Sequence, residues 1–487
     1  MTLRYFKLLI LISLLIGIII LMLFSVVYLY IFAILNFVFI ALLAFIKTRN
    51  KRSNSSLEQK KVVEDDLFIS IHIPIYKEPV STVLKTIQAA INQNYSNFEV
   101  LVIYNNTPDI NYWKPVQNFC EQFSEQVKFL NFLNVKDYKA GALNKALPYI
   151  QPQTDLILTV DADYELSRNA LKFVNSDFIH NKHNLIQYPQ HYNNLDTDCP
   201  VNAEFNHYFE FYSKFAANES LSLPTGTLSA IDKKSLEKLG GWPTVSITED
   251  AQLGIQLFEN NFSAIYIDRV IGAGTAPNAP AEFIKQRERW IYGNFQNLIY
   301  LLKSKKLPLA IKAKLIPQLT CWFNFNFFSY LILLTSAISI SFNLVTAASV
   351  LYIVPITIVS LLTSHLSKFY SFLQSTATFY LAVKAFLLHQ GLAFQSSIYW
   401  LTYFIDTRLP FRRTSKVQSR FKPVYDSLYL IIPIQCIALI FIDHQLQLLG
   451  LSILCYSLLL TYGMYFFNIK LYKNSYNQLA NTISINL

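Results

Sequence analysis

The sequence predicts a multi-span α-helical membrane protein with a doubly wound α/β domain between its membrane segments. Of its 487 residues, 53% are hydrophobic, and the mean hydropathy of +0.30 is too high for an ordinary soluble protein of this length. Long apolar runs without charges lie near both ends of the chain. The more polar residues from Thr48 to Lys314 alternate short apolar runs with helical patterns, which is typical of an α/β sheet.

The basic residues gather beside the apolar runs. The net charge is +10, and on a soluble protein this excess would suggest a nucleic-acid partner. Cytoplasmic loops of membrane proteins carry the same excess of Lys and Arg, so we expect a membrane surface and no nucleic acid. The five cysteines are scattered without a CxxC pair, which predicts reduced and unpaired thiols.

The first apolar run, Leu8–Ile46, contains no Asp, Glu, Lys, Arg or His. It is about 39 residues long, roughly twice the ~20 residues that one spanning helix needs. Basic residues lie on both sides, with Arg4 and Lys7 before it and Lys47 and Arg49 after it. Since both flanks should then be cytoplasmic, the run is predicted to form a hairpin of two spans. A cleaved signal peptide is the alternative, but its apolar core would be much shorter.

The later apolar runs predict four more spans, giving six spans with both chain ends inside. These runs are Gln318–Asn343, Thr346–Leu362, Ser427–Ile442 and Gln447–Phe467. Between them, Lys368–Trp400 is apolar but interrupted by charged and polar residues, so we expect helices in the cytoplasmic interface, with a seventh span as the alternative.

The expected organisation follows from these runs. It comprises an N-terminal hairpin (1–47), the α/β domain (48–308), a helix pair (309–366), interfacial helices with a loop (367–426), and a C-terminal hairpin with a tail (427–487).

Five short apolar runs predict the strands of the α/β domain, and a helix is predicted over Val80–Gln93. The runs are Leu67–Ile75, Phe98–Tyr104, Val127–Val135, Leu156–Val160 and Leu185–Tyr188. Sheets of this kind bind ligands at the carboxyl ends of their strands.

Two carboxylates and a lysine stand where such a ligand would bind. Asp161 and Asp163 directly follow the predicted strand Leu156–Val160, and two carboxylates there can hold a hard divalent cation against a diphosphate. A solvated loop is the alternative. In Lys139–Asn144, a Lys and small residues open a predicted helix, which suits a phosphate group.

The acids of Thr248-Glu249-Asp250 open a predicted helix that runs to Phe258. One interpretation is structural, with Thr248 capping the helix and the two acids favouring its dipole. The other makes Asp250 a general base, kept ionised by the helix dipole.

Gln286-Arg287-Glu288-Arg289-Trp290 precedes the return of the apolar runs. At helical spacing Gln286, Arg289 and Trp290 share one face. Arg289 could neutralise a diphosphate, and Trp290 could stack on a sugar ring. The alternative is an interfacial helix with a snorkelling Arg and an anchoring Trp.

Taken together and in this order, these motifs resemble the processive glycosyltransferases of family 2, which include the cellulose, curdlan, chitin and hyaluronan synthases. Further segments are similar to the bacterial cellulose-synthase-like β-glucan synthases. These segments are Ile73–Pro79, Asn105–Pro108, Lys139–Asn144, Tyr188–Gln190, Thr225–Thr227, Gly240–Trp242 and Phe411–Lys416, the last resembling the gating loop of these enzymes.

The resemblance implies a GT-A-type domain and a role for each matching residue. Asp161 and Asp163 would bind the donor diphosphate and its Mg²⁺ or Mn²⁺, and Asp250 would be the base, with Glu249 as the alternative. The other expected donor contacts are Pro74, Tyr76, Glu78, Asn105, Lys139, Gln286 and Arg289. The expected acceptor contacts are Thr225, Gly226, Thr227 and Trp290, and the expected gating residues are Phe411, Arg413, Thr414 and Lys416.

The resemblance also implies a function. The chain would transfer sugar, with glucose from UDP-glucose favoured, to a growing β-glucan by inversion, and secrete it across the inner (plasma) membrane of a bacterium from a cytoplasmic domain. Its partners would be the UDP-sugar, the polysaccharide, membrane lipids and accessory secretion subunits. The alternatives are a single-sugar transferase acting on a polyprenyl phosphate, a synthase using UDP-N-acetylglucosamine, and a non-enzymatic scaffold.

One position departs from the family pattern. Many relatives carry an Asp at the end of the second strand, where this chain has Tyr104 followed by Asn105. We expect Asn105 to replace some of the hydrogen bonding of that Asp, and we expect Tyr104→Asp to be tolerated.

Overall fold

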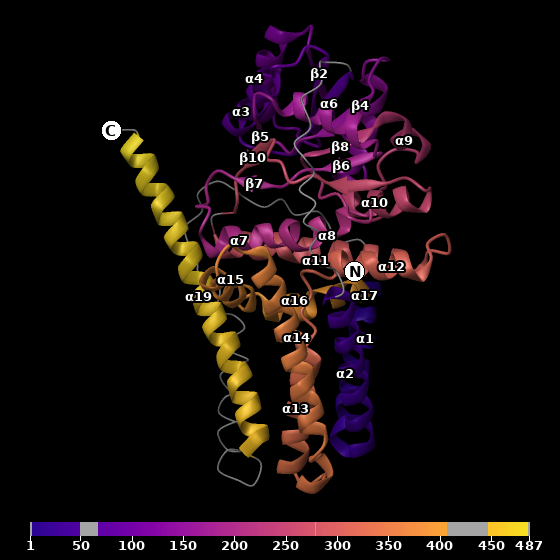
Figure 1. The fold of residues 1–487 in the computed structure, drawn as a ribbon, viewed down its shortest axis with the longest axis vertical. Coiled ribbons are helices and arrows are strands. Elements are labelled where there is room, and N and C mark those ends of the chain that lie inside the picture. The colour runs from indigo at the N-terminus through magenta and orange to yellow at the C-terminus, as the bar shows by residue number, and fades with distance from the viewer. Residues whose placement is uncertain (1, 49–66, 278, 407–446, 486–487) are drawn as a thin grey trace.

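The computed structural model describes residues 2–48, 67–277, 279–406 and 447–485 of the chain. An α/β domain forms one end of the molecule and long apolar helices form the other, with a layer of further helices between them (Figure 1). The beginning of α1 and the end of α19 both lie on the domain side of the apolar helices (Figure 1).

The α/β domain is built on a seven-stranded sheet with the order β3-β2-β1-β4-β8-β6-β9. Neighbouring strands are parallel except at β8, which runs antiparallel to both β4 and β6. The sheet is therefore mixed. The strands are β1 (Ile69–Ile75), β2 (Phe98–Asn105), β3 (Val127–Phe132), β4 (Leu156–Thr159), β6 (Leu185–Gln187), β8 (Ser229–Asp232) and β9 (Ala264–Tyr266).

Helices cover both faces of this sheet, as expected of a doubly wound domain. On one face Ile71 and Ile73 of β1 share a buried cluster with Val83 of α3. On the other face Leu101 of β2 shares a cluster with Leu143 of α5. Burial on both faces explains why the strands read as continuous apolar runs. The domain helices are α3 (Val80–Ile91), α4 (Ile110–Cys120), α5 (Tyr138–Ala146), α6 (Ala170–Asn181), α9 (Lys233–Lys238) and α10 (Glu249–Glu259).

A second, three-stranded sheet with the order β5-β10-β7 lies beside strands β8 and β6 in Figure 1 and was not predicted. Its strands are β5 (Glu165–Leu166), β7 (His191–Tyr192) and β10 (Gly272–Gly274), too short to leave a periodic signal in the sequence.

Four helices in the described part of the chain are long and apolar enough to cross a membrane: Lys7–Phe24, Val26–Lys47, Ala348–Ser375 and Leu449–Lys470. The first two belong to α1 (Thr2–Phe24) and α2 (Val26–Thr48), which form the predicted hairpin. The last two belong to α14 (Ile353–Ser375) and α19 (Gln447–Ile485). The chain is thus a multi-span helical protein with an α/β domain.

The predicted span Gln318–Asn343 is shorter than expected. Helix α13 covers only Asn326–Ser341, whose 16 residues rise about 24 Å. The chain before it leaves the helical path after α12 (Leu309–Leu319). Conversely, α14 extends beyond the predicted Leu362 to Ser375 and includes the beginning of the segment expected at the interface. The predicted span Ser427–Ile442 lies outside the described residues.

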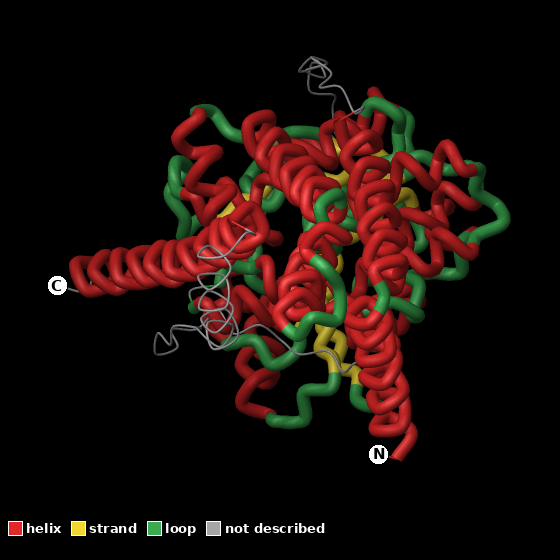
Figure 2. Tube along the Cα trace, turned by 90° about the horizontal axis from the view of Figure 1, so that it is seen from below, coloured by secondary structure: helices red, strands yellow, loops and turns green. Residues whose placement is uncertain are grey.

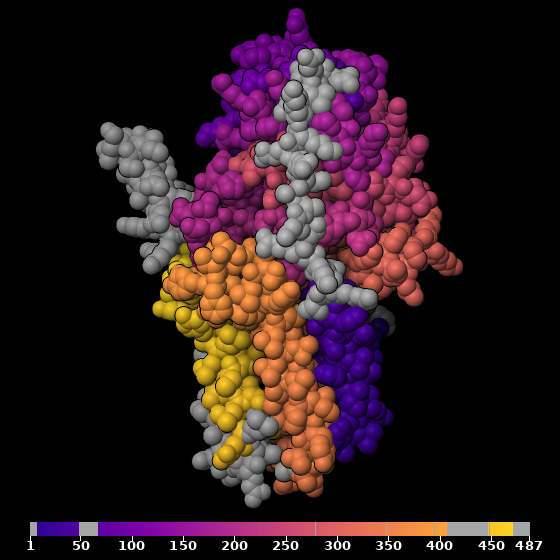
Figure 3. All heavy atoms as spheres, in the orientation of Figure 1, coloured from indigo at the N-terminus to yellow at the C-terminus, as the bar shows by residue number. Residues whose placement is uncertain are grey.

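The layer between the domain and the apolar helices is made of helices that lie across the view in Figure 1. Figure 3 shows atoms of this layer packed between the domain and the apolar helices. Within Lys368–Trp400, α15 and α16 belong to this layer, and after the end of α14 the described chain offers no further candidate span there. Seen from below, the strands lie behind the helices, and the C-terminal part of α19 projects away from them (Figure 2). The layer comprises α7 (Pro200–His207), the π-helical η3 (Tyr208–Ser213), α8 (Lys214–Ala217), α11 (Pro280–Lys303), α12, α15 (Phe379–Gln390), α16 (Ala393–Ile398) and α17 (Thr402–Ile405).

Candidate active site

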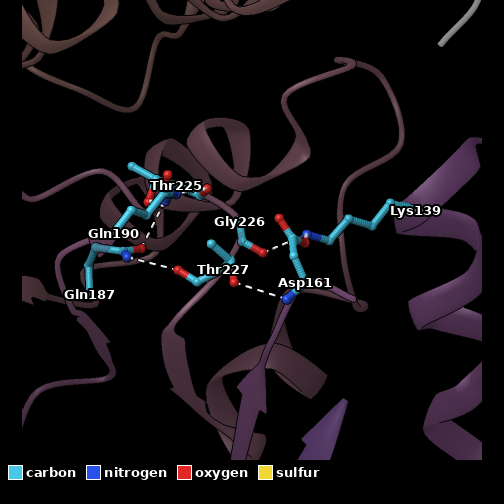
Figure 4. A network of polar contacts seen from close by, with 7 residues as sticks. All are labelled: Lys139, Asp161, Gln187, Gln190, Thr225, Gly226 and Thr227. Carbon is cyan, nitrogen blue, oxygen red and sulfur yellow. Dashed lines mark hydrogen bonds and ion pairs between the residues drawn. The ribbon is translucent and has the colours of Figure 1, made fainter. Parts of the chain in front are cut away.

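Three of the motifs found in the sequence meet at the carboxyl end of β4, although their residues are spread over almost 90 positions of the chain. The Lys139 ammonium, from the first turn of α5, lies 2.6 Å from a carboxylate oxygen of Asp161. It also donates a hydrogen bond to the Gly226 carbonyl at 2.5 Å. The backbone N–H of Asp161 in turn donates to the Thr227 hydroxyl at 2.9 Å. Figure 4 shows this chain of contacts, which joins the predicted diphosphate contacts to the predicted acceptor loop.

Gly226 is where this loop touches the predicted base. Its φ of +81° is in the left-handed region that favours glycine. A Cβ at this position would lie 2.9 Å from a carboxylate oxygen of Asp250 and 3.5 Å from the Lys139 nitrogen. Gly226 therefore lies close to both the predicted base and a predicted diphosphate contact.

Two glutamines hold the Thr225–Thr227 loop, and only one of them belongs to a motif identified in the sequence. Gln187, buried in β6, accepts from the Thr225 N–H at 2.8 Å and donates to the Thr227 carbonyl at 3.0 Å. Gln190 donates to the carbonyl and the hydroxyl of Thr225 at 3.1 and 3.0 Å (Figure 4). Gln187 was not predicted, although a polar residue inside an otherwise apolar strand could have indicated a buried hydrogen-bonding role.

Thr248 fixes the start of α10 against α11 and does not cap its own helix. Its side chain makes no capping hydrogen bond. Instead, the Asn297 amide donates to its carbonyl and its hydroxyl, both at 3.0 Å. A Cβ on Gly293 of α11 would stand 2.4 Å from the Thr248 hydroxyl. Gly293 thus permits the close approach that brings Glu249 and Asp250 beside the helix of Arg289 and Trp290.

The prediction that the helix dipole keeps Asp250 fully ionised at neutral pH is wrong. Burial, with the neighbouring Glu249 as the next cause, raises the pKa of Asp250 to about 7. Burial also raises the pKa of Glu249, against the effect of Lys139. Desolvation of a carboxylate outweighs the dipole here because the dipole is worth at most ~2 kcal/mol and two acids share the site.

Two cations face these acids. Burial alone would lower the pKa of Lys139, but Asp161 and Glu249 raise it above its usual value, so the ammonium stays charged. Burial lowers the pKa of Arg289, while Asp161 and Glu249 act to raise it. A guanidinium remains charged under such conditions. Arg289 therefore belongs to the acidic centre, and the alternative of a snorkelling interfacial Arg does not describe it.

A cavity lined by aromatic side chains opens beside Asp250. It encloses about 560 Å³, counting the part open to solvent, and Asp250, Thr225 and Gln190 also line it. Two of its rings, Tyr208 and Phe209, come from the π-helical η3, a helix form that often occurs at functional sites. Aromatic rings supply the apolar faces on which sugar rings can stack, and hydroxyl and amide groups can bind sugar hydroxyls. The aromatic lining consists of Tyr192, Phe205, Tyr208, Phe209, Trp290 and Trp322.

Arg287, which the sequence did not single out, holds the wall of this cavity together. It is 2% exposed and forms an ion pair with the fully buried Glu204 of α7. His389 of α15 contacts the other carboxylate oxygen of Glu204 at 3.2 Å. The guanidinium also stacks on four rings at 3.8 to 4.9 Å, those of Phe205, Phe283, Trp290 and Trp322. Three of these four rings line the cavity.

The ends of β1 and β2 form the expected nucleoside side of the site. Lys77 has a left-handed φ of +59°, and its N–H donates to the Thr107 hydroxyl at 3.3 Å. Thr107 donates in turn to the Asn105 carbonyl at 3.0 Å. Glu78 accepts a short hydrogen bond from the Tyr76 N–H. The Asn105 side-chain oxygen is buried and has no hydrogen-bond partner among the described residues.

Tyr104 faces away from this side, and its position argues against the expectation that an Asp would be tolerated there. Its side chain is fully buried in the core beside the Phe129 ring, and its hydroxyl donates to the Tyr112 carbonyl at 2.8 Å. Successive strand residues point to opposite faces, so Asn105 occupies the ligand side and Tyr104 the core side.

Asp161 and Asp163, which follow β4, fit a divalent cation only if other ligands, such as substrate phosphates, complete its coordination shell. The described chain offers no group of three or more His, Cys, Asp or Glu that could hold a metal by themselves. Asp161 and Asp163 provide two carboxylates, and Mg²⁺ commonly binds through one or two carboxylates together with substrate phosphates. Asp163 accepts from the Thr275 N–H at 3.4 Å, which directs it toward the same edge.

The remaining predicted residues fall into two groups. Gln286 lies in α11, and its side-chain oxygen is buried without a hydrogen-bond partner in the structure. Pro74 lies in β1. The gating residues Phe411, Arg413, Thr414 and Lys416 lie outside the described residues.

Residues 67–293 match the family described as "Glycosyltransferase like family 2". This part of the chain is a family 2 glycosyltransferase domain. It contains the site residues described above except Asn297, Trp322, His389 and the predicted gating residues. The family prediction made from the motifs is confirmed at this level.

Curated relatives of this glycosyltransferase include synthases. The chain is 24% identical over 264 residues to a cellulose synthase catalytic subunit of Xanthomonas axonopodis, covering 53% of this chain and 35% of the relative. It is 26% identical over 276 residues to a poly-beta-1,6-N-acetyl-D-glucosamine synthase of Staphylococcus epidermidis, covering 55% and 65%. The alignments thus span one third to two thirds of these relatives.

A solved structure has the same fold. The mannosyltransferase of Pyrobaculum calidifontis, in complex with GDP-mannose and Mn²⁺, matches with a TM-score of 0.51 and 18% identity, over 73% of this chain and 97% of the other.

Proposed function

We propose that this family 2 glycosyltransferase is an inverting, processive synthase that adds glucose from UDP-glucose to a β-glucan and moves the product across a bacterial inner membrane. The catalytic domain would then face the cytoplasm. The growing polysaccharide and accessory secretion subunits would be its macromolecular partners.

The observation that carries this proposal is the position of Asp250 between two unlike regions. On one side lie Lys139, Asp161 and Arg289, whose charges suit a diphosphate and its cation. On the other side lies the cavity with its six aromatic side chains, which has the chemistry of a site for sugar rings. A polymerase needs both regions, with its base where they meet.

The reaction that this arrangement supports is a single displacement. The terminal hydroxyl of the acceptor would lie against Asp250, which accepts its proton while the hydroxyl oxygen bonds to the anomeric carbon. The bond from that carbon to the diphosphate breaks at the same time, on the opposite face, so an α-linked donor gives a β-linked product. Lys139 and Arg289 would stabilise the negative charge that develops on the departing UDP.

Asp161 and Asp163 would hold Mg²⁺ or Mn²⁺ against the donor diphosphate. When bound, such a cation neutralises charge on the leaving group. Two carboxylates supply only part of the ligands of such a cation, so substrate phosphate or water would supply the rest.

A second nucleotide sugar is an alternative donor. The relationship to a poly-beta-1,6-N-acetyl-D-glucosamine synthase supports UDP-N-acetylglucosamine as the alternative. A single-sugar transferase acting on a polyprenyl phosphate would share the acidic centre but would not require a long aromatic cavity beside it.

The deciding experiment is synthesis by the purified full chain in lipid nanodiscs. It would be supplied with Mg²⁺ and either radiolabelled UDP-glucose or radiolabelled UDP-N-acetylglucosamine. We expect glucose in a product of high molecular weight that β-glucanases of defined linkage degrade. A polymer formed only from N-acetylglucosamine would replace the donor assignment, and a lipid-soluble product with one sugar would refute the processive mechanism.

A further inference from the structure

A second cavity lies on the other side of the interfacial layer, between the end of α2, the segment before α13, and helices α14 and α15. It encloses about 500 Å³, counting the part open to solvent. The described residues that line it include Lys47 and Lys368 but no Asp or Glu. None of the residues assigned above to the donor, the acceptor or the base contributes to it.

Among the residues that the structure describes, no carboxylate lines the cavity or forms an ion pair with either lysine. Lys368 donates one hydrogen bond, to the Cys321 carbonyl at 2.7 Å, and its ammonium has three donors. Lys47 makes no hydrogen bond or ion pair with the residues that the structure describes. Both lysines line the same cavity, so the positive charges on their side chains repel each other. Charges withdrawn from water are unfavourable unless they are paired, so the cavity is suited to an anion.

The cavity also presents two buried acceptors that need donors. The side-chain oxygens of Asn326 and Gln390, both 3% exposed, have no hydrogen-bond partner in the structure. The amide nitrogen of Asn326 already faces the His365 ring at 3.2 Å. Since a bare phosphate diester only accepts hydrogen bonds, these oxygens favour a ligand that carries hydroxyl groups beside its negative charge.

The position of the cavity indicates where such a ligand comes from. Lys47 is the last residue of the candidate span Val26–Lys47, so the cavity lies at the depth where lipid head groups meet the hydrocarbon. Phe45 of α2 and Leu366 of α14 are exposed by 57% and 63%. Each is an exposed apolar side chain, near a cavity residue in sequence, that an acyl chain can contact.

The geometry points to a binding site for an anionic phospholipid whose head group carries hydroxyls, of the phosphatidylglycerol type. Lys47 and Lys368 would bind the phosphate, and Asn326 and Gln390 would accept from the glycerol hydroxyls. A lipid bound here would connect the N-terminal hairpin to α14 and α15, and so to the interfacial layer.

The test is lipid binding by the purified full chain in a neutral detergent, measured by native mass spectrometry. The probes are phosphatidylglycerol and phosphatidylcholine with the same acyl chains. We expect phosphatidylglycerol to bind more tightly, and Lys47→Gln and Lys368→Gln each to weaken it about 10-fold. The matched control is Lys384→Gln, which removes an equal charge from α15 at a residue that stacks on Tyr380 and does not line the cavity.

Several results would overturn the assignment. One is equal binding of the two lipids, and another is an equal loss in the Lys384→Gln control. Soluble glycerol phosphate, used as a competitor, distinguishes the two sources of this chemistry, since full displacement at similar concentration would identify a soluble ligand. Asn326→Leu should weaken phosphatidylglycerol about threefold without weakening phosphatidic acid, and an equal loss of both would refute the hydroxyl contacts. Melting temperatures of all variants check that they are folded.

Discussion

Asp250 combines a raised pKa with contacts that hold its position. Its carboxylate accepts from the Ala251 N–H at 2.8 Å and lies against Gly226. Asp250→Asn keeps this shape but removes the basicity. We expect turnover to fall by about 10²–10⁴-fold while UDP binding in the presence of Mg²⁺ is nearly unchanged. UDP release and calorimetry measure the two effects, with Glu249→Gln as the comparison. A joint loss of binding and turnover would indicate a structural role instead.

The pKa of about 7 also predicts how activity depends on pH. A base must be unprotonated in the free enzyme, so kcat/KM should rise with pH and level off above about 7. Stability should respond in the opposite direction. The folded state raises the pKa of Asp250, so between about pH 4 and 7 the folded chain holds a proton on this acid that the unfolded chain has lost. The free energy of unfolding that this proton contributes is therefore lost as the pH rises through that range. Asp250→Asn should therefore melt higher than the wild type at pH 8, and less so at pH 5. No difference between the two pH values would contradict the shift.

Tyr104 provides a test of which strand residue faces the ligand. Tyr104→Asp would bury a carboxylate beside Phe129, so we expect a strongly destabilised or unfolded domain. Tyr104→Phe removes only the hydrogen bond to Tyr112, which should cost about 1 kcal/mol. Thermal melting separates the two substitutions. A stable Tyr104→Asp protein with tighter UDP binding would restore the interpretation made from the sequence alone.

Charged residues in recognisable motifs could be assigned a role from the sequence. Residues whose role depends on buried partners from other segments could not. Asp161, Lys139 and Arg289 carry charges at strand ends or in recognised motifs, and the structure brings all three to one edge. Arg287 stands two positions before Arg289 and has the same side chain. Its role depends on Glu204 and four rings from other segments, which no local pattern reports.

At the scale of elements, the five predicted strands exist because each is a buried apolar run, and their boundaries shift by a few residues at most. The antiparallel β8 was missed because its four residues, Ser229–Asp232, are too few to show a period. The error at α14 has a different cause. Lys368 interrupts the apolar pattern and suggested a boundary, but the helix continues because this lysine finds the Cys321 carbonyl and a polar cavity.

The contact between α10 and α11 yields a prediction at this scale. Gly293→Ala would place a methyl group 2.4 Å from the Thr248 hydroxyl, so the two helices must separate. We expect a loss of about 1–3 kcal/mol in stability, together with lower turnover, because Asp250 moves relative to Trp290. Gly17→Ala is the matched control, since a Cβ there meets nothing within 4 Å. Melting temperature and UDP release are the measurements, and unchanged values for both would show that the helices can absorb the methyl group.

At the scale of the whole molecule, the interfacial layer connects the sheet domain to the apolar helices. Glu204 from α7, Arg287 from α11 and His389 from α15 form one buried network within it. The same guanidinium stacks on Trp290 and Trp322, which line the proposed acceptor cavity. The geometry of the catalytic site therefore depends on the packing of helices that stand next to the membrane segments.

This dependence can be measured by removing the charges singly and together. Arg287→Met leaves the Glu204 carboxylate buried without its guanidinium, which should cost about 3–5 kcal/mol. Arg287→Met with Glu204→Gln removes both charges and should recover most of that loss. The control Lys285→Met breaks an ion pair with Glu282 in the same helix, but Lys285 is 47% exposed, so the effect should not exceed ~1 kcal/mol. If the double variant melts like the wild type yet still releases UDP slowly, Arg287 positions the cavity wall as well as stabilising the fold. A single variant as stable as the wild type would mean that the ring stack alone holds the layer together.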